Sequence, residues 1–233
     1  MDLTSLKTIK SLLEKYNTKP QKTMGQNFLI DDRTLDKIIE AADLSSQDTV
    51  VEIGPGLGTL TQALASRAGK VIAIEKDRTM TAILQETLKE YTNVELLQGD
   101  ALKMPTDFLP DSYKLISNLP YYITSPVIRM FLELEKKPAC ILLMVQKEVA
   151  QRICAKPPDM SILAASVQFY AEPSIVSYVT KDKFWPAPNV DSAIIKIVPR
   201  KTAPEVPADL FFKIVKAGFS HPRKQLINNF SVA

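Results

Sequence analysis

Short apolar runs alternate with longer amphipathic segments over most of this 233-residue chain. Runs such as 49–53 and 141–145 have the length and the β-branched content of buried strands. Strands that alternate with helical segments of about ten residues indicate βαβ units and a parallel sheet covered on both faces. The pattern predicts strands over 49–53, 71–74, 94–97, 114–117, 141–145, 175–180 and 193–198, and helices over 35–42, 59–67, 79–90, 127–134, 162–170 and 210–219.

The two ends of the chain differ from this alternating region. Near the N-terminus, apolar residues recur at the spacing of an amphipathic helix, at Leu3, Leu6, Ile9, Leu13 and Tyr16. Residues 199–207 contain three prolines and two adjacent cations, which is typical of a linker. We therefore expect a helical lead-in over 1–24, an α/β catalytic domain over 25–199, and over 200–233 a linker with the beginning of a C-terminal helical domain.

Composition excludes several classes of protein. A content of 45% hydrophobic and 24% charged residues is that of a globular domain, and no apolar run approaches the ~18 residues of a membrane span. The start of the chain lacks the apolar core of a secretory signal. Two cysteines and one histidine cannot build a zinc cluster or a disulfide framework, so we expect no metal. We expect an inert buried thiol at Cys140 and a cytoplasmic protein.

Charge is unevenly placed along the chain. The net charge is +3, with +3 in residues 1–24 and +5 in residues 195–233, so the segment between them sums to −5. Basic ends around an acidic centre fit a polyanion that is held at the periphery of the protein. Ordinary solvated lysines explain the same distribution equally well, so charge alone does not identify a partner.

Glycines cluster at one predicted strand end. Three of the seven glycines, Gly54, Gly56 and Gly58, lie between the first predicted strand of the alternating region and a predicted helix. Glycines there allow a tight turn and a close approach of the backbone to a ligand that lies across the strand ends. The spacing differs from the dinucleotide fingerprint, in which the third glycine comes three residues after the second.

Acidic residues follow the next two predicted strands. Glu75 ends one strand, 19 residues after Gly56, and its carboxylate can accept bonds from both ribose hydroxyls of an adenosine. Asp100 follows the next strand and can accept a bond from an adenine amino group. Each acid alone would usually be solvated surface. Together at successive strand ends they indicate an adenosine-containing cofactor, either a nicotinamide dinucleotide or S-adenosylmethionine.

The loop after the fourth strand favours S-adenosylmethionine. It reads Asn118-Leu119-Pro120-Tyr121, and Asn-apolar-Pro-aromatic is typical of methyltransferases that act on exocyclic amino groups. The lone pair of an aromatic amine is delocalised, so the Asn118 oxygen and a backbone carbonyl that accept its N–H bonds would direct the lone pair at the methyl donor. Pro120 fixes the turn, and the face of the Tyr121 ring, rather than its hydroxyl, would stack on a displaced base.

With these motifs the chain resembles the 16S ribosomal RNA adenine dimethyltransferases, within the rRNA adenine N6-methyltransferase family. The matching segments run over most of the chain: Gly25–Leu29, Glu52–Gly58, Glu75, Asp100, Asn118–Tyr121, Gln146–Val149, Phe184–Ser192, Arg223-Lys224 and Asn228-Asn229. The resemblance implies a Rossmann-like S-adenosylmethionine-dependent methyltransferase fold with a mostly parallel sheet, followed by the start of a small, truncated C-terminal helical domain. It implies an enzyme that dimethylates two adjacent adenines near the 3′ end of 16S rRNA in ribosome biogenesis.

The resemblance also implies roles for residues. Contacts with S-adenosylmethionine are implied for Gln26, Asn27, Leu29, Gly54, Gly56, Glu75, Asp100 and Asn118. The catalytic loop would consist of Asn118, Leu119, Pro120 and Tyr121. Substrate contacts would come from Tyr121, Phe184, Arg223 and Lys224, with Phe184 holding the flipped adenine against Tyr121. The expected partner is 16S rRNA within a small-subunit ribosomal particle, with no membrane involved, and the protein is expected to be a monomer.

Two features depart from the family pattern. Pro158–Ser161 stands where the family has Tyr-Gly, and the chain ends at Ala233, where the helical domain would begin.

Three alternative functions fit parts of the sequence. They are the same chemistry on large-subunit rRNA, a non-catalytic nucleic-acid-binding factor, and a nicotinamide dehydrogenase. The 25–29 and 184–192 segments favour the small subunit, Asn118 and Tyr121 favour catalysis, and the glycine spacing disfavours the dehydrogenase.

Overall fold

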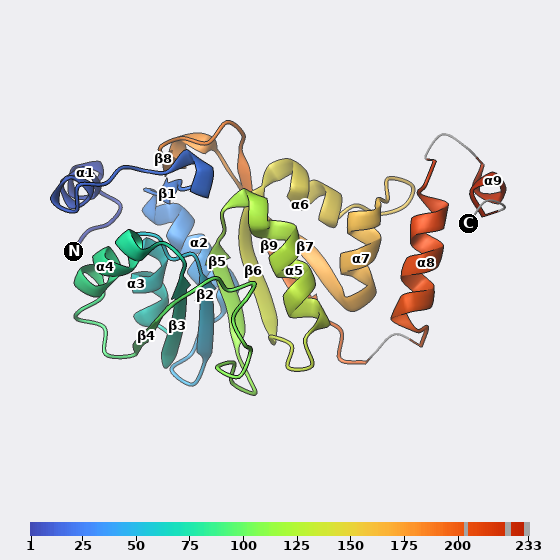
Figure 1. Ribbon diagram of the computed structural model, residues 1–233, viewed down its shortest axis with the longest axis horizontal. Coiled ribbons are helices and arrows are strands. Elements are labelled where there is room, and N and C mark those ends of the chain that lie inside the picture. Colours follow the sequence, from blue (N-terminus) through green and yellow to red (C-terminus); the bar gives the residue numbers. More distant parts are fainter. Residues whose placement is uncertain (203–204, 222–224, 231–233) are drawn as a thin grey trace.

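A seven-stranded sheet forms the centre of the protein, which is given by a computed structural model that describes residues 1–202, 205–221 and 225–230 (Figure 1). The strand order is β4-β3-β2-β5-β6-β9-β7, and β9 alone runs antiparallel to its neighbours. The predicted, mostly parallel sheet is therefore confirmed. Its strands are β2 (Thr49–Ile53), β3 (Lys70–Glu75), β4 (Val94–Gln98), β5 (Lys114–Asn118), β6 (Cys140–Gln146), β7 (Ala171–Val179) and β9 (Ser192–Pro199).

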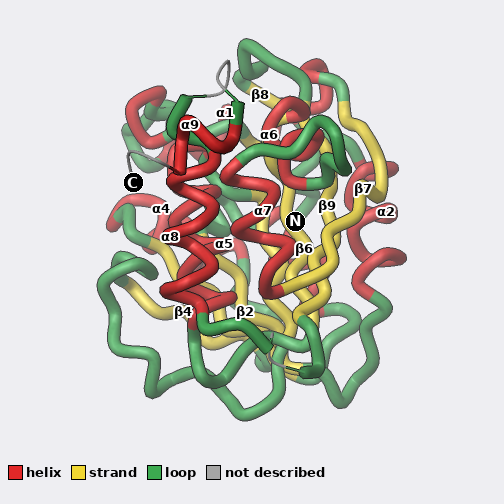
Figure 2. The backbone as a smooth tube through the Cα atoms, turned by 90° about the vertical axis from the view of Figure 1, so that its right-hand side faces the viewer, coloured by secondary structure: helices red, strands yellow, loops and turns green. Residues whose placement is uncertain are grey.

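Helices cover both faces of the sheet, with α5 and α7 on one side and α2 on the other in Figure 2. The first layer contains α5 (Thr124–Glu133), α6 (Lys147–Ile153) and α7 (Ile162–Tyr170), and the second contains α2 (Asp32–Ala42) and α3 (Thr59–Ala65). Strand β6 shows why the sequence is apolar at every position from Cys140 to Val145. Leu143 and Val145 pack into the first layer and Leu142 and Met144 into the second, so both sets of side chains are buried.

The N-terminal residues form the predicted amphipathic helix, α1 (Leu6–Lys15), with Ile9, Leu12 and Leu13 buried. Helix α1 packs in a small apolar cluster with Met80 and Ile83 of α4 (Arg78–Thr87). The chain then passes through the 3-10 turn η1 (Lys22–Met24) into β1 (Phe28–Leu29), which pairs antiparallel with β8 (Phe184–Trp185). This pairing joins the N-terminal segment to a segment more than a hundred residues later in the sequence.

Three differences from the sequence prediction have physical reasons. Helix α2 begins at Asp32 rather than near residue 35, because the Asp31 carboxylate caps it by accepting the Thr34 N–H at 2.9 Å. Strand β7 begins at Ala171 rather than near residue 175, since an edge strand tolerates Pro173. Helix α6 is absent from the prediction, because it follows β6 directly and no turn residue between them marks where the helix begins.

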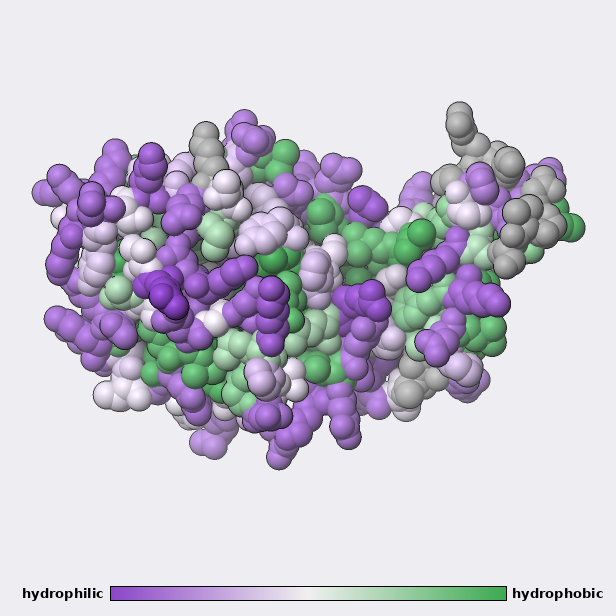
Figure 3. All heavy atoms as spheres, in the orientation of Figure 1, coloured by the Kyte–Doolittle hydropathy of each residue, from purple (hydrophilic) through white to green (hydrophobic). Residues whose placement is uncertain are grey.

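Beyond β9, the described residues form α8 (Ala208–Gly218) and α9 (Leu226–Phe230) at one end of the molecule (Figure 1). Helix α8 packs on α7 through aromatic rings, with the centroids of Phe169 and Phe211 4.2 Å apart. Hydrophobic residues also gather at this junction on the surface in Figure 3. The division into 1–24, 25–199 and 200–233 stays a proposal. Among the described residues, no helix is both long and apolar enough to cross a membrane.

Both cysteines carry free thiols. Cys140 is buried in β6, as the apolar run around it predicted, and burial raises the pKa of its thiol. The thiol of Cys154 also has a raised pKa because of burial. Raised pKa values leave little reactive thiolate at neutral pH.

Candidate active site

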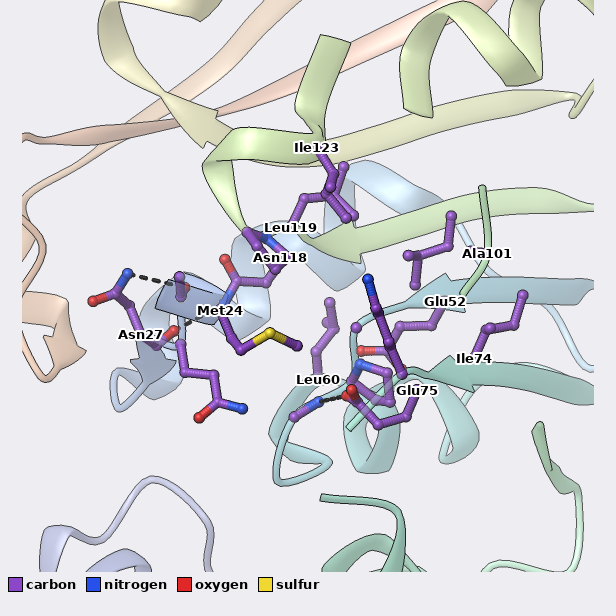
Figure 4. A pocket seen from close by; sticks show the side chains of 18 of the residues that line it. Met24, Asn27, Glu52, Leu60, Ile74, Glu75, Ala101, Asn118, Leu119 and Ile123 are labelled. Carbon is purple, nitrogen blue, oxygen red and sulfur yellow. Dashed lines mark hydrogen bonds between the residues drawn. The ribbon is translucent and has the colours of Figure 1, made fainter. Parts of the chain in front are cut away.

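A pocket opens at the carboxyl ends of β2, β3 and β5, where the strand order reverses (Figure 4). Strands β2 and β5 are paired only at Val50–Lys114 and Val51–Leu115 before they separate. Beyond that point the buried Ser117 hydroxyl accepts the Ile53 N–H at 2.8 Å and replaces the missing ladder bond. Ligands of open α/β sheets bind in such a crevice, so the topology itself marks this pocket as the candidate site.

The glycine loop after β2 forms one wall of the pocket. Gly54 has φ 67°, a left-handed conformation that favours glycine, and its N–H donates to the Ile74 carbonyl at 2.9 Å. A Cβ atom at residue 54 would lie 3.4 Å from Cδ of Pro120. Glycine therefore lets the loop after β5 come close to the loop after β2. These two loops are the ones that the sequence assigned to cofactor binding and catalysis.

Glu75 at the end of β3 is almost fully buried beside this loop, with 6% of its surface exposed. Its carboxylate accepts the Gly56 N–H at 3.1 Å and the Asp77 N–H at 2.8 Å. Burial raises the pKa of this carboxyl, although the backbone N–H bonds favour its charged form. The side chain lines the pocket, so it can accept hydrogen bonds from a pair of hydroxyl groups there.

Asp100 follows β4 as Glu75 ends β3, and it is paired with a lysine that the sequence motifs do not identify. The Lys76 Nζ atom lies 3.1 Å from Oδ2 of Asp100, while Oδ1 accepts the Leu102 N–H at 3.1 Å. Burial alone would raise the pKa of Asp100, but Lys76 and the Leu102 amide outweigh it and the pKa is lowered. Asp100 is therefore a charged acceptor at the pocket.

The N-terminal segment closes another side of the pocket. Gln26 donates through Nε2 to Asp77 at 3.2 Å, which ties this segment to the start of α4. Asn27 donates through Nδ2 to the Gly25 carbonyl at 3.2 Å. Leu29 is buried and pairs in register with Phe184 across the β1–β8 ladder. Gln26, Asn27 and Leu29 all line the pocket, far in sequence from its other walls.

The loop after β5 brings the predicted catalytic residues to the same pocket. Asn118 faces the Asn27 carbonyl with its Nδ2 atom at 3.5 Å, and none of the described residues donates to its Oδ1 atom. Leu119 is buried, and Pro120 precedes the 3-10 turn η2 (Tyr121–Ile123). Because Nδ2 is directed at Asn27, the Asn118 oxygen is available to accept an N–H bond from a substrate.

Tyr121 and Phe184 both line the pocket, Tyr121 half-buried and Phe184 buried. The structure thus brings together every predicted site residue that it describes. Arg223 and Lys224 lie outside the described residues. No group of three or more His, Cys, Asp or Glu side chains that could hold a metal ion occurs in the described part of the chain.

Glu52 is a further lining residue, for which the sequence motif predicts no role. It lies in β2, only 1% exposed, and its Oε2 atom has no hydrogen-bond partner among the described residues. Burial, together with the nearby Glu75 carboxylate, raises its pKa to about 8. The sequence feature that could have identified Glu52 is an acid inside an apolar strand, since a buried unpaired carboxyl is rare.

The raised pKa of Glu52 makes the stability of the protein depend on pH. In the unfolded chain the carboxyl ionises near its ordinary pKa of 4.5, whereas the folded protein retains the proton up to about 8. The free energy of unfolding of the wild type is therefore unaffected by Glu52 below pH 4.5, where the carboxyl is protonated in both states, and it falls as the pH rises toward 8. We expect the free energy of unfolding of Glu52→Gln to exceed that of the wild type by an amount that grows by roughly 1.4 kcal/mol per pH unit in this window.

Urea unfolding of both proteins at pH 5 and pH 8 measures this advantage. Glu95→Gln is a suitable control, because Glu95 lies in β4 with a largely exposed side chain that pairs with Lys70. The difference in free energy of unfolding between Glu95→Gln and the wild type should not change between pH 5 and pH 8. Equal pH dependence of the unfolding free energy in wild type and Glu52→Gln would show that Glu52 is ionised in the folded protein.

Fold and site together define a class of protein. A parallel sheet with a glycine loop after one strand, a buried acid after the next and Asn-Leu-Pro-Tyr at the switch point is the arrangement of a Rossmann-like, S-adenosylmethionine-dependent methyltransferase. Comparisons with known proteins agree. The family model described as "Ribosomal RNA adenine dimethylase" matches residues 17–233. The chain therefore belongs to the ribosomal RNA adenine dimethylase family and is an rRNA adenine methyltransferase.

Individual relatives cover most of the chain. It is 50% identical over 224 residues to "Ribosomal RNA small subunit methyltransferase A" of Dehalococcoides mccartyi. The matched region covers 94% of this chain and 77% of the relative. The protein of that name from Pelotomaculum thermopropionicum is 41% identical, over 97% of this chain and 82% of its own length.

Two solved structures are similar in fold. A dimethyladenosine transferase from Plasmodium falciparum has a TM-score of 0.78 and 34% identity, covering 87% of this chain and 74% of its own. The 23S rRNA methyltransferase ErmE has a TM-score of 0.76 and 28% identity, covering 88% and 84%. The resemblance that the motifs indicated is thereby confirmed.

Proposed function

We propose that the protein dimethylates the exocyclic amino groups of two adjacent adenines near the 3′ end of 16S rRNA, within a small-subunit ribosomal particle. The observation that carries the chemistry is the meeting of Asn118 with the glycine-loop pocket. None of the described residues donates to its side-chain oxygen, at the point where the two loops converge. The choice of the small subunit is supported by relatives named for that subunit at 41–50% identity.

The pocket fits S-adenosylmethionine by the chemistry of its donors and acceptors. We propose that Glu75 holds the ribose hydroxyls and that Asp100 accepts from the adenine amino group. Gly54 and Gly56 carry no side chain that would obstruct the ligand, and Gln26, Asn27, Leu29 and Asn118 would complete the contacts. When bound, this cofactor supplies a methyl group already activated by a sulfonium.

Asn118 would orient the target amine by accepting one of its N–H bonds through Oδ1. Pro120 sets the direction of the loop, and Tyr121 and Phe184 supply aromatic faces on which the displaced base can stack. The pocket contains no histidine to act as general base, and His221 lies outside the residues that line it. Because the methyl donor is activated, the amine can lose its proton to solvent after the transfer.

Methylation of large-subunit rRNA is the second candidate, supported by the fold likeness to ErmE. Primer extension separates the two. Ribosomal particles from cells that lack the modification would be incubated with the protein and S-adenosylmethionine, and both rRNAs then copied by reverse transcriptase. We expect new stops at two adjacent adenines near the small-subunit 3′ end, absent without the cofactor. Stops in the large-subunit rRNA alone would contradict the proposed target.

RNA affinity is expected to depend on the basic C-terminal segment. We propose that Arg223 and Lys224 contact phosphates, so that replacing both with alanine flattens the slope of log affinity against log salt by roughly one to two units. Filter binding over a salt series measures the slope. Replacing Lys70 of β3, which is paired with Glu95 of the edge strand β4, serves as the control. An unchanged slope in the double variant would assign the phosphate contacts elsewhere.

The monomeric state and the cytoplasmic location stay predictions, as does the assignment of 200–233 to a linker and the start of a helical RNA-binding domain. Asn229 contributes one observation to the last point. It is buried and donates through Nδ2 to the Gly218 carbonyl at 2.8 Å, which holds α9 against the end of α8.

A further inference from the structure

The hydroxyl of Tyr121 has a partner that the stacking interpretation does not require. Its oxygen lies 2.7 Å from Oγ of Ser192, 71 residues later in the chain. Ser192 has no exposed surface, and Tyr121 is the only partner of its hydroxyl among the described residues. The bond therefore joins the catalytic loop after β5 to the first residue of β9.

Ser192 is a rigid point of attachment. It is paired in register with Gln146 of β6 on one side and with Val179 of β7 on the other. A residue held between two strands has a fixed backbone, and its short side chain has a single rotatable bond before the oxygen. Tyr121, in contrast, lies in a 3-10 turn that has no side-chain cap. The bond therefore restrains the loop that carries Tyr121 against the fixed backbone of β9.

The geometry of tyrosine determines what this bond controls. The phenolic oxygen lies on the axis that runs from Cβ through the ring, so holding it fixes the direction of that axis. The bond does not restrict rotation of the ring about this axis, which depends on packing and on a stacked base. Phe184, the other aromatic wall, precedes Ser192 in the same segment, from β8 into β9. One segment therefore supplies the second wall and sets the orientation of the first.

We propose that Ser192 is a positioning residue for methyl transfer, whose hydroxyl holds the Tyr121 ring at the angle at which the target adenine stacks beside Asn118. This inference rests on the proposed adenine methylation. Misplacing a reacting group by about 1 Å can cost on the order of a hundredfold in rate. A tilted ring that still offers a stacking face should cost less, and we expect about a tenfold loss in each variant below.

Single-turnover methylation at saturating S-adenosylmethionine tests the proposal with Ser192→Ala, Tyr121→Phe and the double variant. Both single variants should lose about tenfold in rate, and the double variant should be no slower than either, because all three lack the same bond. Cofactor affinity, measured by titration calorimetry, should stay at the wild-type value. The assay uses whichever ribosomal particle the wild-type protein methylates, so that an error in the proposed target does not decide the outcome.

Tyr113→Phe is the matched control. Its buried hydroxyl donates to the Lys136 carbonyl at 2.9 Å, just before β5 begins and so at the other end of that strand from the pocket. It should lose stability without losing single-turnover rate. Tyr121→Phe probes the bond from its less buried end, so the test holds even where Ser192→Ala fails to fold. A wild-type rate in folded Tyr121→Phe, or losses that multiply in the double variant, would overturn the proposal.

Discussion

Replacing Asn118 with alanine is expected to slow methyl transfer by about 10²–10³-fold, the usual effect of removing one preorganised hydrogen-bonding group at a reaction centre. The reason is local. The side chain is directed by the Asn27 carbonyl, which leaves its oxygen free to accept from the target amine. Among the described residues that line the pocket, no other places an amide oxygen without a donor at the end of β5, where the two loops meet.

Single-turnover methylation of small-subunit particles, run beside thermal melts, measures this effect. Tyr121→Ala is an informative comparison, because it should weaken base stacking by about 1–3 kcal/mol while leaving cofactor affinity nearly unchanged. If Asn118-Leu-Pro-Tyr only closes a turn, melting temperature and activity should fall together in both variants. Near-normal methylation by a well-folded Asn118→Ala protein would place the chemistry in another loop.

Replacing Glu75 with alanine should weaken S-adenosylmethionine binding by tenfold or more. Two charge-assisted hydrogen bonds to the ribose would be lost, each of about 1.5–3 kcal/mol. The structure adds a second reason, since the carboxylate also accepts the Gly56 and Asp77 N–H groups and so holds the glycine loop against β3. Titration calorimetry on the wild type and the variant measures the change in affinity.

Glu86→Ala is the matched control for this experiment. Glu86 is an acid on α4 that pairs with Lys15 at 2.7 Å and does not line the pocket. Its replacement should leave cofactor affinity unchanged. NADH should bind neither the wild type nor the variants appreciably. Wild-type affinity for S-adenosylmethionine in the Glu75→Ala protein would contradict the assigned role of Glu75, and tight NADH binding would contradict the assignment of the pocket to S-adenosylmethionine.

Local patterns predicted the sheet well because each element carries its own signal. The apolar run of β6, the glycine loop before α3 and the acid that ends β3 are properties of single segments, and the rule that ligands bind at strand ends brings them together. The β1–β8 ladder escaped prediction because two residues per strand leave no periodicity. It depends on two segments that meet only in the folded chain.

The same distinction applies to the site. Asn118, Glu75 and Asp100 could be assigned from their places at strand ends. Their neighbours could not, because Lys76 meets Asp100, and Ser192 meets Tyr121, only where separate strands lie side by side in the folded protein. The Glu52 oxygen that has no hydrogen-bond partner among the described residues is likewise a property of the folded protein. The stacking role of Tyr121 followed from its residue type, whereas the attachment of its hydroxyl required the register of β9.

Mass analysis of the small-subunit rRNA tests the proposed activity most directly. Particles from cells that lack the modification would be incubated with S-adenosylmethionine and either the wild-type protein or Asn118→Ala, and the 3′ terminal fragment of the rRNA then digested and sequenced by fragmentation. The wild-type protein should yield dimethyladenosine at two adjacent positions, and the variant should yield unmodified adenines. An unmodified fragment after incubation with the wild type, with dimethyladenosine found only in large-subunit rRNA, would contradict the proposed function.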